Sequence, residues 1–435
     1  FFFTPTPASA ILSGLVGSEM CIRDSLQYAL WGAWLPVTAR YLSATTAEGG
    51  LGFSGSEIGM ILGLAGSIGA IAAPFIAGQI ADRYFSTERV LGLLVTAGGA
   101  VKWITAHQTE YGAWLVLSII YSVLYMPTLA LSNSITFSHI DDQENDFPKI
   151  RVWGTIGWIA ASWVFPMVWL QQGLHFQWMP PFIVGTEVPD VTNRLADALK
   201  FSGIISVSYG AFCLLLPHTS PKRDAIEKLA FKKAFELFKK SSFTVLVIAS
   251  LAVSVIHQIY FLQTGPFLSH IGILDSQIGP AMTIGQFAEI LTMAYLGFFL
   301  KRLGFHKVIS IGVAAYCIRY AIFGTGSFPV WIMVVSQAFH GFCYAFFFAA
   351  AYIYVDKLAD EDVRHSAQTV FGIIILGGGP VIGGWLSGYL QNIYTLDGVF
   401  NYSDFWYSLS LIGLITTLFF YFSFQTQLGK DNVKQ

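Results

Sequence analysis

A single acidic residue lies inside a long apolar stretch of the chain. Glu289 occurs in GPAMTIGQFAEILTMAYLGFFL (residues 279–300), and the ten positions on either side of it carry no charge. Gln286 precedes it by three positions, so the two side chains share one face of a helix. Apolar surroundings favour the neutral form of a carboxyl group. Glu289 could therefore bind a proton and release it on exposure to water; the alternative is a structural pairing with a buried arginine.

A second candidate face combines a cation, a hydroxyl and an aromatic ring. Arg151 begins an apolar stretch in FPKIRVWGTIGWIAASW, and Thr155 and Trp158 follow at spacings of four and three. These spacings place the three side chains on one side of a helix. An arginine at a helix entrance is often only an anchor at the membrane surface. The combined stripe favours a face that contacts a ligand.

Two further cations occur in apolar stretches. Arg319 lies in AAYCIRYAIFG, where we expect a structural ion pair rather than contact with a ligand. Lys102 can extend its ammonium group along its aliphatic stem to the membrane surface.

Two histidines add polar edges among aromatic residues. His257 is followed by Gln258, and His340 precedes Tyr344 by four positions. A histidine at membrane depth is usually a hydrogen-bonded core residue, and contact with a ligand is the alternative for both. Polar or ionisable groups inside a membrane are costly, so each is a candidate for function.

The sequence contains no recognisable catalytic or metal-binding pattern. The motifs H-E-x-x-H and G-x-S-x-G and the Walker loop are all absent. Four cysteines occur singly and without metal-ligand spacing, at Cys21, Cys213, Cys317 and Cys343. We therefore expect neither an enzyme nor a metal or other cofactor.

The composition indicates a chain dissolved in lipid. Of its 435 residues, 54% are hydrophobic and 11% are charged, whereas soluble proteins carry about 25% charged residues. The net charge of −2 and the lack of basic clusters argue against a nucleic-acid partner.

Twelve apolar stretches are long enough to cross a bilayer, which takes about 20 residues each. Their length favours helices over barrel strands. We therefore predict an all-α membrane protein with two six-helix bundles. The predicted spans are 26–44, 56–80, 88–107, 111–137, 152–174, 200–217, 243–268, 276–300, 306–324, 328–355, 366–392 and 404–424.

The distribution of basic residues predicts the orientation. The even-numbered loops between spans and the C-terminal tail carry 18 Lys and Arg residues, and the odd-numbered loops carry three. Cytoplasmic loops are enriched in these residues, so both termini should be cytoplasmic. The predicted divisions are a first bundle over 26–217, a basic cytoplasmic linker over 218–242, a second bundle over 243–424 and a tail over 425–435. The linker suits either an amphipathic helix on the membrane or a solvated segment, and residues 175–199 form an external loop without a predicted role.

Residues 1–25 do not resemble the rest of the chain. The stretch MCIRDS (residues 20–25) back-translates to ATG TGT ATA AGA GAC AG, with Glu19 supplying a preceding AG. This string matches a transposon end used in preparing sequencing libraries. A secretory signal, the alternative, would need a basic start that the initial phenylalanines do not provide. We therefore expect residues 1–25 to be translated adaptor that replaces a native N-terminus.

The two halves share features typical of one transporter superfamily. GQIADRYFSTERV (78–90) and FFLKRLGFHKVI (298–309) are both basic turns after an apolar span. Gly78, Asp82 and Arg83 resemble the G-x-x-x-D-R loop of the major facilitator superfamily. Glycine-rich stretches at 59–78 and 372–388 allow close helix packing or, alternatively, hinge motion.

Longer motifs resemble a specific family of that superfamily, the bacterial nucleoside:proton symporters. The similar segments are QYALWGAWL (27–35), YMPTL (125–129), FPKIRVWGTIGW (147–158), GQFAE (285–289), RHSAQ (364–368) and GGWLSG (383–388). The resemblance extends from Leu26 to about residue 424.

The resemblance implies a bacterial inner-membrane protein that imports nucleosides with protons, as a monomer, by alternating access between the two halves. Glu289 would carry the proton. Phe261 replaces a polar amide of familiar members, His340 replaces a tyrosine, and Ala345 replaces an acid, so Glu289 would have to carry the proton alone. The same fold carrying another polar solute such as a sugar is the alternative, and a membrane sensor or enzyme is a remote one. The implied substrate contacts are Arg151, Thr155, Trp158, Gln258, Gln286, Glu289, His340 and Tyr344.

Overall fold

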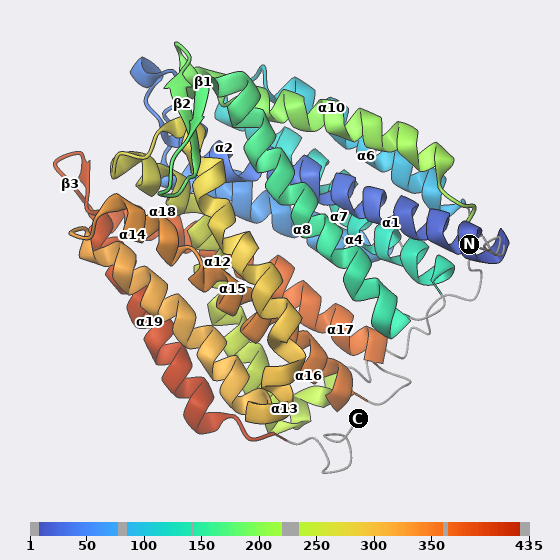
Figure 1. Ribbon diagram of the computed structural model, residues 1–435. Coiled ribbons are helices and arrows are strands. Elements are labelled where there is room, and N and C mark those ends of the chain that lie inside the picture. The colour runs from blue at the N-terminus through green and yellow to red at the C-terminus, as the bar shows by residue number, and fades with distance from the viewer. Residues whose placement is uncertain (1–7, 77–84, 141–142, 220–234, 360–363, 427–435) are drawn as a thin grey trace.

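A computed structural model gives the arrangement of the chain in two helical bundles. It describes residues 8–76, 85–140, 143–219, 235–359 and 364–426. The predicted G-x-x-x-D-R turn and most of the basic linker lie outside these ranges. The helices coloured blue to green form one bundle, and those coloured yellow to red form the other (Figure 1).

The first bundle contains the helices that precede the linker. α1 packs against α8 and α10, while α4 and α6 both pack against α7. Its elements are α1 (Ala8–Gly32), α2 (Leu35–Ser43), η1 (Thr46–Glu48), α3 (Gly55–Gly59), η2 (Met60–Leu64), α4 (Ala65–Phe75), α6 (Thr87–Thr105), α7 (Tyr111–His139), α8 (Gln143–Phe165), η4 (Pro166–Leu170), α9 (Val191–Arg194), α10 (Asp197–Phe212) and η5 (Cys213–Leu215).

The second bundle is built around α12 and α13. α13 covers 48 residues in two helical parts that meet at Gly304, where a positive φ of 75° turns the chain. The elements are η6 (Leu237–Lys239), α12 (Ser241–His270), η7 (Asp275–Gln277), α13 (Ile278–Thr325), α14 (Val330–Ser336), α15 (Phe339–Phe342), η8 (Cys343–Ala349), α16 (Ala350–Leu358), α17 (Arg364–Ile373), η9 (Ile374–Gly378), α18 (Gly379–Ile393), β3 (Thr395–Leu396), β4 (Val399–Phe400) and α19 (Tyr402–Ser423).

By length and composition, nine helical segments of the described chain could cross a membrane. One of them, Asp275–Thr325, contains two predicted spans joined at Gly304. Two predicted spans are not among the nine segments. The span 26–44 corresponds to α1 and α2, and the span 88–107 corresponds to α6. The all-helical prediction is confirmed, and the arrangement is consistent with twelve spans.

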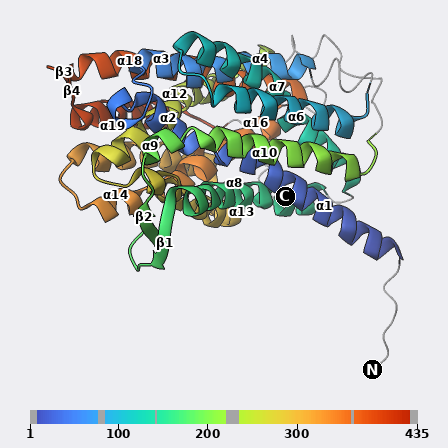
Figure 2. The ribbon, with the colours of Figure 1, turned by 90° about the horizontal axis from the view of Figure 1, so that it is seen from above.

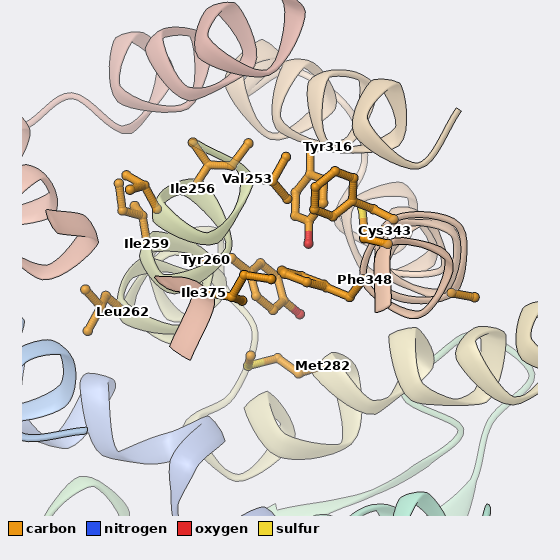
Figure 3. Packing of buried hydrophobic residues seen from close by; sticks show 14 of the residues in the cluster. Val253, Ile256, Ile259, Tyr260, Leu262, Met282, Tyr316, Cys343, Phe348 and Ile375 are labelled. Atoms are coloured by element: carbon orange, nitrogen blue, oxygen red, sulfur yellow. The ribbon is translucent and has the colours of Figure 1, made fainter. Parts of the chain in front are cut away.

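Part of the core of the second bundle is formed by apolar side chains of α12, α13 and η8. Val253, Ile256 and Tyr260 of α12 lie near Tyr316 of α13 and Phe348 of η8 (Figure 3), and all five are nearly or fully buried. This packing fixes the face of α12 that also carries His257. Side chains of the site are thus attached to a rigid part of the fold.

The first helix differs from its predicted start. α1 begins at Ala8 and continues through residue 25 without a break. Arg23 and Asp24 are buried and pair at 2.7 Å, and Arg23 also donates to Thr136 Oγ1 and to the Ser132 carbonyl. Leu26 is therefore not the start of the first helix. The adaptor origin of residues 1–25 concerns the DNA and stays a prediction.

A β-hairpin that helps to join the halves overlaps both the end of the predicted span 152–174 and the predicted external loop 175–199. The helical part of that span ends at Leu170, so its predicted end was wrong. β1 (Gln171–Phe176) pairs antiparallel with β2 (Ile183–Glu187), and the hairpin projects from one end of the molecule (Figure 2). At its base, Gln277 Nε2 donates to Gln171 Oε1 at 2.7 Å, and the Ser276 amide donates to Glu187 at 2.8 Å.

An ion pair joins the halves beside the hairpin. Asp275, before α13, accepts from Arg40 Nε at 2.9 Å and from Thr192 Oγ1 at 2.8 Å, and its side chain is buried. Both donors belong to the first half. The conformation described here is therefore held closed at the hairpin end.

Glycines permit the close contact between α3 and α18. A Cβ added to Gly59 would lie 2.1 Å from the Gly384 carbonyl oxygen, and one added to Gly388 would lie 2.6 Å from the Ser56 Cα. These glycines therefore serve helix packing across the two halves. The hinge interpretation of the glycine-rich stretches stays a prediction.

Candidate functional site

A cavity of about 400 Å³ lies between the two bundles. Residues from α1, η2, α7 and α8 line it on one side, and residues from α12, α13, η8 and η9 line it on the other. The structure brings all eight candidate contacts to this one cavity. They are Arg151, Thr155, Trp158, Gln258, Gln286, Glu289, His340 and Tyr344.

α8 presents its polar stripe to the cavity and its apolar face outward. Arg151, Thr155 and Trp158 line the cavity, whereas Trp153 and Ile156 are exposed on the outer surface of the bundle. The alternation follows from the helical period, which separates residues three or four apart from those between them. The sequence interpretation of this stripe as one face therefore agrees with the structure.

α13 divides its residues in the same way. Gln286 and Glu289 line the cavity, whereas Phe287, Leu291 and Tyr295, spaced by four, are exposed on the outside. Glu289 thus does not face the surroundings of the bundle. The Oε1 atom of Gln286 is buried and has no hydrogen-bond partner in the described part of the chain. The face offers a carboxyl and an amide that a polyhydroxylated ligand can engage.

Arg151 is held by an aromatic ring beside the cavity. Its guanidinium carbon lies 4.0 Å from the centre of the Tyr28 ring, a cation–π contact. Arg151 and Glu289 both line the cavity, yet the two groups form no ion pair within the described residues. Tyr344 is a hydrogen-bond partner of Arg151. A guanidinium group has five N–H donors, so the others are available to a ligand.

Replacing Gly154 by alanine is expected to weaken ligand binding about tenfold by displacing Arg151. The new Cβ would lie 2.6 Å from Arg151 Nη1 and 2.6 Å from a Tyr28 ring carbon, so one of the two must move. Loss of a charge-assisted hydrogen bond has an effect of this size. The measurement is the concentration of unlabelled ligand that halves the exchange of labelled ligand across the membrane of proteoliposomes. Gly112→Ala is the matched control, since a Cβ there meets nothing within 4 Å; equal affinities of both variants would contradict the prediction.

An aromatic wall on the first half was not predicted from the sequence. Trp31 contacts both Trp158 (5.8 Å between ring centres) and Tyr125 (5.4 Å). Tyr121 stacks on Tyr125 (5.4 Å) and contacts Trp34 (5.8 Å). All five rings line the cavity. Trp31 and Trp34, three positions apart in the first span, were the available sequence signal. The wall offers flat surfaces on which a planar ring can stack.

The expected environment of Lys102 and the expected ion pair of Arg319 were wrong, whereas Arg319 does not line the cavity, as expected for a structural residue. Lys102 is buried and lines the cavity instead of extending to the membrane surface. Arg319 is fully buried but has no carboxylate partner among the described residues. Its guanidinium carbon lies 4.0 Å from the centre of the Tyr260 ring and 5.1 Å from that of Tyr320, and Nη1 lies 3.1 Å from His340 Nδ1. Aromatic faces and a neutral histidine take the place of the anion.

The contact with Arg319 determines which nitrogen of His340 carries the proton. A guanidinium group can only donate, so Nδ1 of His340 accepts and Nε2 carries the hydrogen. The His340 ring lies against the cavity and stacks near His257, with 5.5 Å between ring centres. His257 is itself bonded to Tyr316 through Nδ1 at 2.8 Å. Gln258 also lines the cavity, and its Nε2 donates across the halves to the Leu62 carbonyl at 3.1 Å.

Replacing Arg319 by methionine is expected to lower ligand affinity roughly tenfold, because His340 loses the contact that fixes it as an Nε2 donor. A double-mutant cycle separates this effect from a loss of packing. His340→Gln carries an amide donor that does not depend on Arg319. In that background, Arg319→Met should produce little further loss of competition affinity. An equal loss in both backgrounds would show that Arg319 acts independently of His340.

Similarity to known proteins identifies the family of this chain. The model of the nucleoside H+ symporter family matches residues 18–428. The chain belongs to this family. It is 32% identical over 411 residues to the putative nucleoside transporter YegT of Escherichia coli, with 91% of each chain covered. It is 26% identical to the xanthosine permease of the same organism, covering 96% of this chain and 98% of the permease.

A solved structure of the family has the same fold. The nucleoside transporter NupG superposes with a TM-score of 0.79 at 26% identity, covering 94% of this chain and 99% of NupG. A D-xylose–proton symporter, at 12% identity, has a TM-score of 0.70 and shows only that the major facilitator fold is shared. The family member described here is thus a membrane protein of the predicted fold class, and the resemblance drawn from its motifs is confirmed.

Proposed function

We propose that this family member takes up nucleosides together with protons, through the cavity between its halves. The single observation that carries the proposal is the convergence of both predicted faces on that cavity. Arg151, Thr155 and Trp158 come from α8, and Gln286 and Glu289 come from α13. A site between two halves that move against each other is the arrangement by which secondary transporters work.

The chemistry of the cavity suits a nucleoside. The aromatic wall can stack on the base, while Gln286 and Glu289 can bond the vicinal hydroxyls of ribose. Arg151 and the Nε2 of His340 supply donors for acceptor atoms of the base. The size also fits, since a cavity of about 400 Å³ lies in the range of pockets for small molecules.

The proposed cycle couples the proton to the substrate through Glu289. With the cavity open to the outside, Glu289 binds a proton and the nucleoside enters. The halves then rock, and both are released on the other side. The excess of basic residues in the even loops supports a cytoplasmic location for those loops and both termini, with the hairpin end outside. The conformation with Arg40 and Asp275 paired is then the one closed to the outside. The proposed transporter is a monomer in the bacterial inner membrane.

Uptake into proteoliposomes containing the purified chain tests the proposal. Labelled uridine and adenosine should accumulate when the outside is acidified, and a panel of sugars should neither accumulate nor compete. Sugar accumulation without nucleoside accumulation would favour a sugar carrier of the same fold. Absence of transport of either class would favour a sensor.

A further inference from the structure

Lys102 places a second basic group in the cavity, in addition to Arg151, at the far end of the aromatic wall from Trp158. It belongs to α6 and is 3% exposed. Its ammonium nitrogen lies 3.2 Å from the centre of the Trp34 ring and 4.0 Å from that of Tyr121. These two rings hold the cation in place by its attraction to their faces.

The N–H donors of the Lys102 ammonium group have no acceptor among the described residues. A lysine carries three N–H donors, and an aromatic face does not replace a hydrogen-bond acceptor. Within the described residues, Lys102 has neither an acceptor at hydrogen-bond distance nor an anionic partner. A buried charge without such a partner is costly, whereas a ligand that fills the cavity can supply the missing oxygen atoms.

The ionisable groups that line the cavity are unbalanced. The lining includes two basic side chains, Lys102 and Arg151, and one carboxyl group, Glu289, together with His257 and His340. A ligand with negative charge or several oxygen atoms stabilises the protonated, charged form of Lys102. When Glu289 has taken up its proton, no anion of the lining remains to balance the two basic side chains. The proton-loaded cavity therefore favours a ligand that carries negative charge or several carbonyl oxygens.

We propose that Lys102 contacts the base and gives this transporter a preference for nucleosides with anionic or dioxo bases over those whose bases lack the second carbonyl oxygen or carry an amino group. The inference rests on the proposed nucleoside uptake and adds its substrate class. A base that stacks at the Trp34 and Tyr121 end of the aromatic wall presents an edge to Lys102. A deprotonated dioxopurine, as in xanthosine, offers that edge a negative charge and carbonyl oxygens that accept from the ammonium group. The exocyclic amino group of adenosine or cytidine presents a donor where the ammonium needs an acceptor.

Competition at fixed pH tests this preference without any gradient. The purified full-length protein in proteoliposomes exchanges labelled uridine for internal unlabelled uridine, and unlabelled xanthosine and inosine compete. These two differ only at the 2-position of the base, and xanthosine is largely an anion at neutral pH. The wild type should bind xanthosine roughly tenfold more tightly than inosine, the size expected for a charge-assisted hydrogen bond. A wild type that does not distinguish the two would overturn the inference.

Variants of Lys102 assign the preference to its charge. Lys102→Met should bring the ratio of the two affinities close to one, and Lys102→Arg should largely preserve it. Lys200→Met is the matched control and should keep the wild-type ratio, because Lys200 is a half-exposed residue of α10 paired with Asp197 at 2.7 Å. If Lys102→Met does not fold, Lys102→Gln provides the uncharged variant. A ratio that survives removal of the charge would overturn the inference.

Two further results separate this inference from the proposed function. Uridine 5′-monophosphate carries its charge on the ribose side; if it competes better than uridine, and the advantage disappears in Lys102→Met, then Lys102 binds phosphate and does not contact the base. If labelled uridine is not exchanged at all, the proposed function itself has failed. Uridine exchange with an unchanged xanthosine preference in Lys102→Met contradicts the role of Lys102 alone.

Discussion

Replacing Glu289 by glutamine is expected to abolish nucleoside accumulation driven by a pH gradient while exchange continues. The amide has nearly the same shape and can still bond ribose hydroxyls, but it cannot release a proton. One pH unit stores about 1.4 kcal/mol per proton, a roughly tenfold accumulation for one proton per nucleoside. The variant should therefore only equilibrate its substrate across the membrane. The measurement is the ratio of internal to external uridine with and without an imposed gradient.

A surface carboxylate provides the control for Glu289→Gln. Glu110 is exposed and precedes α7, away from the cavity, so Glu110→Gln should accumulate uridine as the wild type does. Full accumulation by Glu289→Gln would show that the proton travels by another group. Loss of both accumulation and exchange would show a defect in binding or folding rather than in coupling.

Replacing Arg151 by methionine is expected to lower nucleoside affinity by one to two orders of magnitude. Arg151 lines the cavity and is positioned by Tyr28 at 4.0 Å, with donors left for the ligand. Hydrogen bonds to charged groups contribute about 1.5–3 kcal/mol, which corresponds to that range. Arg151→Lys should be intermediate, because an ammonium lacks the planar fork of a guanidinium. The measurement is the uridine concentration that half-saturates exchange.

The alternative for Arg151, an anchor at the membrane surface, predicts a different result. An anchor affects the amount of folded protein but not the concentration that half-saturates exchange. Arg302→Met serves as the control, since Arg302 is exposed beside the turn at Gly304. Wild-type affinity in folded Arg151→Met would contradict its assignment to the ligand face.

The sequence was sufficient for features that depend on helical period and apolar length. The stripe formed by Arg151, Thr155 and Trp158, and the pair formed by Gln286 and Glu289, occupy single helix faces because of their spacing. Their meeting in one cavity required the expectation that two similar halves enclose a central site. The family resemblance supplied that expectation, and the structure places both faces on the same cavity.

The features that the sequence did not predict depend on contacts between distant segments. Lys102 was expected to extend to the surface, but Trp34 and Tyr121 approach it from other helices and hold it in the cavity. Arg319 lacked its expected anion because aromatic rings and His340 surround it instead. The hairpin at 171–187 follows from pairing across a loop whose sequence shows no regular alternation. The partners of Lys102 and Arg319 on other helices cannot be found from spacing along one helix. The two hairpin strands are close in the chain, but their register is irregular.

The account rests on the claim that a nucleoside and a proton cross the membrane together through this cavity. Simultaneous recording of both fluxes tests that claim most directly. Purified wild-type protein is reconstituted in weakly buffered proteoliposomes at equal pH on both sides, and uridine is added outside. We predict that the external medium becomes more alkaline as uridine enters, and that Glu289→Gln gives uridine entry without the pH change. Uridine entry by the wild type with no proton movement would contradict the account.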